Sequence, residues 1–122
     1  MTNKSQRKKP KTLMPSLKEK KRYLVYEVIS DEKFSYSDIK LEIINNFKNF
    51  FGLEGLGKAG LDFIEYENNK GIVKVSAKGV DMLKASFCFL RKINKGDVVI
   101  RSLGLSGMIN KARSKFIFGG LN

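Results

Sequence analysis

The sequence contains no histidine and no tryptophan, and it has only one cysteine and two prolines among 122 residues. Histidine is the commonest general base and the commonest metal ligand in proteins, so its absence removes both roles. The single cysteine, Cys88, cannot form an internal disulfide, and without histidine it builds neither a zinc cluster nor a Cys–His nucleophile. We therefore expect no catalytic residue, no metal-ligating residue and no bound cofactor in this chain.

Long apolar runs are also missing. No stretch approaches the roughly 18–20 apolar residues that a membrane helix needs. The N-terminus is polar and rich in lysine, unlike the apolar centre of a signal peptide. Together with the single cysteine, these absences favour a reducing, intracellular setting. We expect a cytoplasmic protein with no membrane partner.

What the sequence has in excess is positive charge, and this charge lies at the two ends. Residues 1–22 contain nine lysines and arginines against one acid, and residues 101–122 contain four against none. The 78 residues between them contain 11 bases and 11 acids, so the ends account for the whole formal net charge of +12. Charge needed only for solubility would be scattered. Two basic blocks beside a neutral body indicate a polyanionic partner, because Lys and Arg that contact phosphates release condensed counterions.

The length predicts one domain with its own hydrophobic core. Residues 1–15 hold both prolines and show no apolar periodicity, which predicts a disordered basic arm. The alternative is that this arm only aids solubility. Residues 16–122 are expected to form a single α+β domain.

Periodicity predicts the element order β-α-β-β-α-β, followed by a C-terminal helix. The first helix is expected to begin at Ser35 and to end at Gly52, the second to begin at Val80 and to close at the turn 94–96, and the third to begin at Ser106. The strands are expected in four runs rich in β-branched and aromatic residues, at 22–29, 61–67, 71–76 and 97–103. This is the ferredoxin-like arrangement, also used by RNA-recognition-motif domains, in which two helices cover one face of a four-stranded antiparallel sheet.

Alternation predicts which face of this sheet is buried. Val73 and Val75, like Val98 and Ile100, are apolar at alternate positions, so their side is expected to face the helices. The third strand lacks the aromatic residues with which RNA-recognition motifs stack bases, so we expect contacts with phosphates rather than with bases. The open face is expected to carry a mixed set that includes two bases and two rings: Tyr23, Glu27, Phe63, Glu65, Ile72, Lys74, Val99 and Arg101.

The glycine-rich run at 52–58, GLEGLGK, fits the start of a phosphate-binding loop. Two features argue against that interpretation. Position 59 is Ala, where the motif needs a Ser or Thr hydroxyl for magnesium, and the run follows a helix instead of a strand. We expect a flexible connection in which Lys58 contacts RNA or a partner.

The C-terminal segment combines glycines, a hydroxyl and bases. Gly104 and Gly107 allow a ligand to approach the backbone, and Ser106 at a helix start would offer an anion site. Lys111 and Lys115 are four residues apart and share one helix face. The alternative is that Ser106 only caps the helix and the bases are solvated.

The second helix carries a second apolar stripe, formed by Met82, Phe89 and Ile93, where a surface helix should be polar. Either the C-terminal helix or another subunit must cover this stripe. We favour the C-terminal helix, because its own apolar residues also need a partner.

Several stretches together resemble the ribonuclease P protein component 2 family. They are LKEKKRYLVYEVIS at 17–30, the Ala-Gly pair at 59–60, GIVKV at 71–75 and, most specifically, IRSLGLSG at 100–107 followed by basic residues. The family usually continues the last stretch with Thr, whereas this chain has Met108.

The resemblance implies a protein cofactor for an RNA catalyst. Such a chain would be the non-catalytic subunit of an endoribonuclease in which RNA with bound magnesium removes the 5′ leader from precursor tRNA. It would pair with component 3, a TIM-barrel-like subunit, assemble with other ribonuclease P proteins, and be able to self-associate. Residues expected to contact the RNA are Lys18, Lys20, Lys21, Arg22, Lys58, Arg101, Ser106, Lys111, Arg113 and Lys115.

Three other functions are considered. The first is a general module that binds structured RNA, such as a ribosome-associated factor outside ribonuclease P. The second is a small-molecule-sensing ferredoxin-like domain with basic tails, which the charge distribution disfavours. The third is a phosphate-transferring enzyme built on residues 52–58, which Ala59 disfavours.

Overall fold

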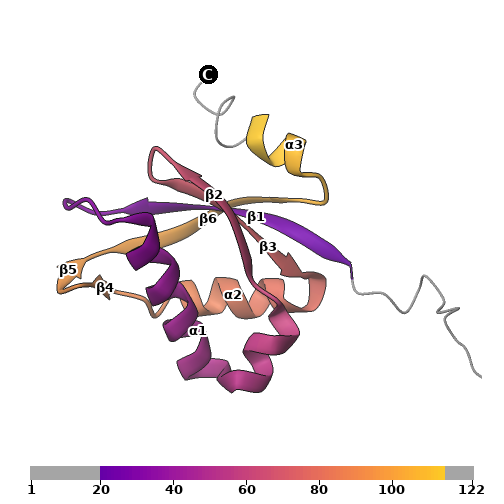
Figure 1. Cartoon of the computed structure of the whole chain (residues 1–122), viewed down its shortest axis with the longest axis horizontal. Helices are drawn as coiled ribbons and strands as arrows, with labels where there is room; N and C mark the ends of the chain where they lie inside the picture. The colour runs from indigo at the N-terminus through magenta and orange to yellow at the C-terminus, as the bar shows by residue number, and fades with distance from the viewer. Residues whose placement is uncertain (1–19, 115–122) are drawn as a thin grey trace, which may run out of the picture.

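The computed structural model describes residues 20–114 (Figure 1). In chain order the elements are β1 (Lys21–Ile29), α1 (Tyr36–Ala59), β2 (Asp62–Glu67), β3 (Lys70–Ser76), a 3-10 turn (Ala77–Gly79), α2 (Val80–Phe87), β4 (Lys92–Ile93), β5 (Gly96–Asp97), β6 (Val99–Ser106) and α3 (Ile109–Ala112). The predicted element order is confirmed, with a small β4–β5 hairpin added between α2 and the last strand. The predicted arm at 1–15 lies outside the described residues.

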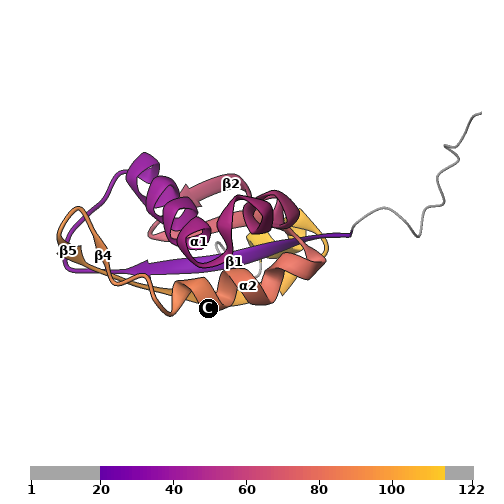
Figure 2. The ribbon, with the colours of Figure 1, turned by 90° about the horizontal axis from the view of Figure 1, so that it is seen from below.

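The main sheet has four antiparallel strands in the order β2-β3-β1-β6. Helices α1 and α2 cover one face, and α3 lies on the other (Figure 1). Seen from below, α1 and α2 run side by side across the sheet (Figure 2). The predicted α+β ferredoxin-like fold is confirmed.

The main core lies between the sheet and these two helices. Alternate residues of β1, such as Leu24 and Tyr26, are fully buried in it and meet Ile43 and Phe47 of α1. The four residues predicted to face the helices are all buried in this core, which confirms that prediction: Val73, Val75, Val98 and Ile100.

Helix α1 is longer than predicted. Ser35 is its N-cap, as expected, and its Oγ accepts a hydrogen bond from the backbone N–H of Asp38 at 3.1 Å. Gly52 has a φ of 73° and kinks the helix, which then continues to a left-handed cap at Gly60. The expected flexible connection at 52–58 is therefore wrong. Within this run Gly55 permits close packing instead, because a Cβ there would lie 3.3 Å from Met82 Cε of α2.

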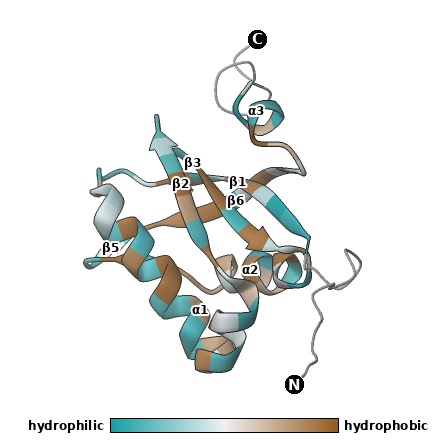
Figure 3. Ribbon diagram, turned by 45° about the vertical axis from the view of Figure 1, so that its right-hand side comes forward, coloured by the Kyte–Doolittle hydropathy of each residue, from teal (hydrophilic) through white to brown (hydrophobic). Residues whose placement is uncertain are grey.

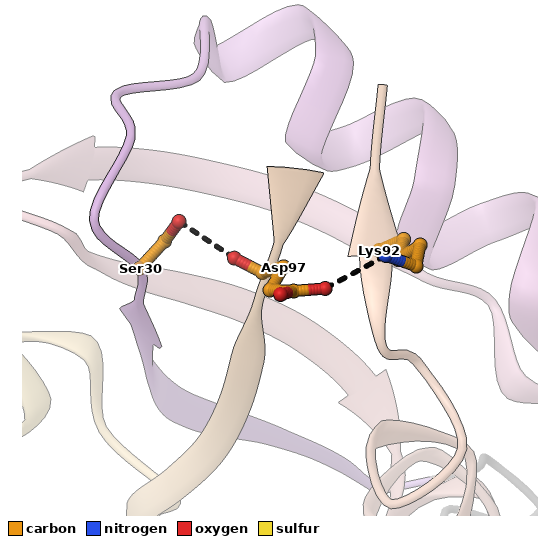
Figure 4. A network of polar contacts seen from close by, with 3 residues as sticks. All are labelled: Ser30, Lys92 and Asp97. Atoms are coloured by element: carbon orange, nitrogen blue, oxygen red, sulfur yellow. Dashed lines mark hydrogen bonds and ion pairs between the residues drawn. The ribbon is translucent and has the colours of Figure 1, made fainter. Parts of the chain in front are cut away.

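Helix α2 is shorter than predicted and ends at Phe87. The next residues form the β4–β5 hairpin, whose base is held by two polar contacts (Figure 4). Ser30 Oγ donates a hydrogen bond to the carbonyl of Asp97 at 2.7 Å, and Lys92 Nζ lies 2.8 Å from Asp97 Oδ1. The hydrogen bond and the charge of Lys92 lower the pKa of Asp97. The hairpin delays the start of the last strand from the expected residue 97 to Val99.

The described part of the C-terminal helix, α3, lies on the sheet face opposite α2, so the prediction that it covers α2 is wrong. Ala112 of α3 is buried on the opposite face of the sheet, together with Val25 and Ile72. These two strand residues are apolar on the side away from α1, and α3 removes them from water.

A bulge in β2 overturns the expected position of Phe63. The register with β3 shifts between Phe63 and Glu65, so Phe63 packs in the main core, 6.5 Å between ring centroids from Tyr26. Ile64 packs instead on the face that α3 covers. Tyr23 lies on this same face, which confirms its predicted position.

Candidate nucleic-acid interface

Three chain segments meet where β1 begins. Lys21 pairs with Ser76 at the end of β3, and the backbone N–H of Ala77 donates to the carbonyl of Lys20 at 2.8 Å. The Ser76 hydroxyl donates to the carbonyl of Lys58, near the end of α1, at 3.0 Å. The start of β1, the end of β3 and the end of α1 are thus hydrogen-bonded together. Each of them contributes a lysine or lies next to one.

Four exposed lysines gather here, and we call them the basic end: Lys20, Lys21, Lys58 and Lys78. Lys58 and Lys78 line the same cavity of about 220 Å³. Lys21 Nζ would lie 3.3 Å from a Cβ at Gly60, which places its ammonium group beside the cap of α1. Figure 3 shows the first residues of β1 as a hydrophilic stretch ahead of its apolar centre.

No lysine of the basic end forms an ion pair with an acid in the described part of the chain. The ion pairs found between residues 20 and 114 join Lys92 to Asp97, Arg101 to Glu27 and Arg113 to Glu65, and none involves a lysine of the basic end. Exposed ammonium groups without an ion-pair partner are available to phosphates. Residues 1–19, which are also basic, precede Lys20 in the sequence.

The end of β6 lies at the same end of the sheet as the start of β1. Because β6 runs antiparallel to β1, Ser106 at the end of β6 lies opposite Tyr23 near the start of β1. Helix α3 follows, with Lys111 exposed on it and Ala112 packed over β1. The other described bases of the C-terminal block lie elsewhere: Arg101 is opposite Glu27, toward the far end of β1, and Arg113 is bonded to Glu65 of β2.

Two of the predicted RNA-contacting residues bind acids instead. Arg101 Nη2 lies 2.8 Å from Glu27 Oε1 on the neighbouring strand, and Arg113 Nε donates to Glu65 Oε1 at 2.6 Å. The second pair holds α3 to β2. Both arginines therefore have structural partners, and their contact with RNA stays a prediction.

Arg22 and Ser106, also predicted to contact RNA, are bonded to backbone groups close to them in the sequence. Arg22 is half-buried, and its Nη1 donates to the carbonyl of Lys21 at 3.2 Å. The hydroxyl of Ser106 bonds to the backbone of Met108, which is itself the N-cap of α3. Ser106 was expected to begin a helix, but it lies at the end of β6, two residues before the N-cap of α3. Lys18 and Lys115 lie outside the described residues.

The predicted protein-interface residues do not form one stripe, because α2 carries Met82 but ends at Phe87, before Phe89 and Ile93. Ile93 is fully buried in β4, and Met82 is half-buried against the core. Phe89 is 58% exposed, and its ring lies 4.6 Å, between centroids, from that of Phe50, itself 50% exposed. Of the three, Phe89 alone offers a large exposed apolar surface.

Sequence reasoning missed Lys78, since nothing in the sequence marks it. Its closeness to Lys58 depends on how the turn after β3 packs on the end of α1, where a Cβ at Gly79 would lie only 2.9 Å from Ala59 Cα. Between residues 20 and 114, no three His, Cys, Asp or Glu side chains are placed to hold a metal ion, and no helix is both long and apolar enough to cross a membrane.

The sequence profile of the Rpp14/Pop5 family matches residues 22–117. This chain belongs to the Rpp14/Pop5 family. Ribonuclease P protein component 2 of Methanosarcina mazei is 36% identical over 107 residues, which cover 88% of this chain and 92% of the relative. The protein of the same name from Thermococcus kodakarensis is 34% identical over 113 residues, covering 91% and 94%.

A solved structure shares the fold of this Rpp14/Pop5 member. A chain in the cryo-EM structure of yeast ribonuclease MRP superposes with a TM-score of 0.62, covering 75% of this chain and 76% of that one. The two are 11% identical, so this likeness shows the fold alone. The predicted family is confirmed by the profile and by the relatives.

Proposed function

We propose that this chain is a protein subunit of ribonuclease P, which assists a catalytic RNA in removing the 5′ leader from precursor tRNA. The observation that carries the proposal is the match, over nearly the whole length of both chains, to relatives named ribonuclease P protein component 2. The cluster of exposed lysines at the basic end supports it, because that end suits a phosphate-rich partner.

In this proposal the protein supplies positive charge and the RNA supplies the chemistry. The lysines of the basic end would lie against closely packed phosphates and neutralise part of their charge. RNA strands that repel one another less hold their active geometry at a lower magnesium concentration. The magnesium ions that serve the reaction would be bound by the RNA, and no side chain of this protein would take part in bond cleavage.

The protein would work in the cytoplasm with other ribonuclease P proteins. We expect component 3 as its direct partner, a second copy of the chain in a two-plus-two assembly, and precursor tRNA only through the RNA. Phe89 remains a predicted protein-contacting residue on the strength of its exposure.

Reconstitution tests the proposal. The full chain is combined with component 3 and the catalytic RNA of the same organism, and precursor-tRNA cleavage is measured across magnesium concentrations. We compare the wild type with two variants that each lose four lysines to Gln. The basic-end variant changes Lys20, Lys21, Lys58 and Lys78, and the control variant changes four exposed lysines elsewhere: Lys33, Lys48, Lys84 and Lys95.

We expect the wild type to lower the magnesium requirement for cleavage, the basic-end variant to lose most of this effect, and the control variant to keep it. A chain that leaves cleavage unchanged at every magnesium concentration would refute the proposed function. If it also bound many unrelated structured RNAs equally well, the general RNA-binding module would be the better description.

A further inference from the structure

The cavity at the basic end lies between the end of α1 and the start of α2. Its lining residues are Lys58, Lys78, Gly79 and Met82, and its volume is about 220 Å³. At about 30 Å³ for each molecule, this volume equals that of roughly seven waters. A phosphate on the protein surface needs ammonium or N–H partners but no cavity of this size. The cavity therefore has room for a larger group than a phosphate.

The walls of this cavity are held together by Ser76, which is fully buried. Its Oγ donates a hydrogen bond to the carbonyl of Lys58 at 3.0 Å and accepts one from the backbone N–H of Gly79 at 3.1 Å. Lys58 belongs to α1 and Gly79 is the N-cap of α2, so one hydroxyl fixes both walls. A site that is already formed costs less conformational entropy when a ligand binds.

The lining combines an apolar part with two ammonium groups. Gly79 is buried and Met82 is half-buried, whereas Lys58 and Lys78 are exposed. The thioether of a methionine makes favourable contacts with aromatic rings, and the aliphatic stems of lysines add apolar surface. The charged ends of the two lysines remain available to an anion next to the ring. An aromatic ring that carries a phosphate matches both parts.

No acid offsets the charge of the two lysines within the cavity, as far as the described residues form its lining. The acids nearest in the sequence are Glu54 on α1 and Asp81 on α2, and neither is a lining residue. The lining also has no amide or hydroxyl side chain with which to read the edge of a base. The site therefore suits a ring with a phosphate whatever the pattern of donors and acceptors on the ring.

We infer that this cavity binds the base of one unpaired RNA nucleotide, which lies against Met82 while its phosphate lies between Lys58 and Lys78. Bases in a duplex are stacked and paired, whereas bases in loops and bulges can turn outward into a protein site. The cavity would thus recognise that a nucleotide is unpaired, and not which base it carries. The inference rests on the proposed function only in taking RNA as the partner.

Methyl NMR of the wild-type full chain tests the inference. The four methionines are labelled with ¹³C at Cε, and two RNA hairpins with the same number of phosphates are titrated in. One hairpin carries a single bulged adenosine, and the other carries an abasic residue at that position. We expect the adenosine hairpin to shift the Met82 methyl resonance through the ring current of the base, and the abasic hairpin to leave it in place. Met108, which is 59% exposed and outside the cavity, should respond equally to both.

Binding affinities give a second measurement. The adenosine hairpin should bind about two- to tenfold more tightly than the abasic one, the range expected for a contact between sulfur and an aromatic ring. Met82→Ala should remove this difference, whereas Leu41→Ala, at a leucine that is 60% exposed on the first half of α1, should keep it. Thermal denaturation checks that both variants fold, and the methyl shift of the wild type does not depend on either.

Three results would overturn the inference. If both hairpins bind equally and the Met82 methyl stays in place, the base site is wrong while the proposed function stands. If neither hairpin binds, the base site and the role of charge are both wrong. If adenosine monophosphate shifts the Met82 methyl at a lower concentration than the adenosine hairpin does, the occupant is a free nucleotide and not RNA.

Discussion

The basic-end variant provides the sharpest test of how this Rpp14/Pop5 protein meets RNA. Changing Lys20, Lys21, Lys58 and Lys78 to Gln removes four exposed ammonium groups but keeps most of each aliphatic stem. None of the four side chains forms an ion pair with an acid between residues 20 and 114. Stability should therefore change by no more than about 0.5 kcal/mol, the usual limit for surface substitutions. Any loss of RNA binding can then be assigned to charge.

The expected magnitude follows from counterion release. Each phosphate contact contributes about 0.7–0.9 to the slope of log affinity against log salt. If all four lysines meet phosphates, the variant's slope should be shallower than that of the wild type by about 3. Over a fourfold rise in salt, the wild type should then lose about 60-fold more affinity than the variant, so that the two converge at high salt.

The assay is fluorescence anisotropy of labelled ribonuclease P RNA titrated with the full chain at a series of KCl concentrations. The control variant loses the same net charge from four other sites: Lys33, Lys48, Lys84 and Lys95. It should keep the slope of the wild type. If both variants flatten the slope equally, only the overall charge matters and there is no localised site. If the basic-end variant keeps the slope of the wild type, these four lysines do not meet phosphates.

Three further predictions concern stability. A Cβ at Gly71 would overlap Cζ and Oη of the buried Tyr26, so Gly71→Ala should lower the free energy of unfolding by about 1–3 kcal/mol. A Cβ at Gly57 would have no atom within 4 Å, so Gly57→Ala should raise that free energy by up to about 1 kcal/mol. Thermal denaturation measures both changes, and equal effects would contradict this packing. Burial raises the pKa of Tyr26 above its usual value of about 10. The free energy of unfolding should therefore keep its full value below about pH 10 and fall above it. In urea unfolding at about pH 11, Tyr26→Phe should lose less of this free energy than the wild type. A double-mutant cycle on Arg113→Ala and Glu65→Ala should give a coupling energy of about 0.5–1 kcal/mol. Because the pair is partly exposed, this energy should shrink in high salt. A coupling energy of zero would show that this pair does not hold α3.

Local patterns were enough to predict the main elements and the buried face of the sheet. The alternate valines of β3 require only that one side meet the helices, and Ser35 offers a side-chain oxygen to the first turn of α1 wherever that helix lies. Such signals act over a few residues, so they survive without knowledge of the rest of the fold.

The errors arose where packing overrides a local signal. Gly52 normally ends a helix, yet here α1 resumes because Gly55 and Ala59 are small enough to lie against α2 and its preceding turn. Phe63 changed sides because one extra residue in β2 inverts the alternation beyond it. Neither outcome can be read from the residues alone, since each depends on the neighbouring element.

The sequence by itself determined the order of the main elements, the buried side of β3 and of the start of β6, and the concentration of charge in two terminal blocks. Only the tertiary structure decided that Lys58 and Lys78 lie beside the start of β1, and that Arg101 and Arg113 bind acids. The physical reason is the antiparallel pairing of β1 with both β3 and β6, which brings one strand start beside two strand ends that lie more than 50 residues further along the chain.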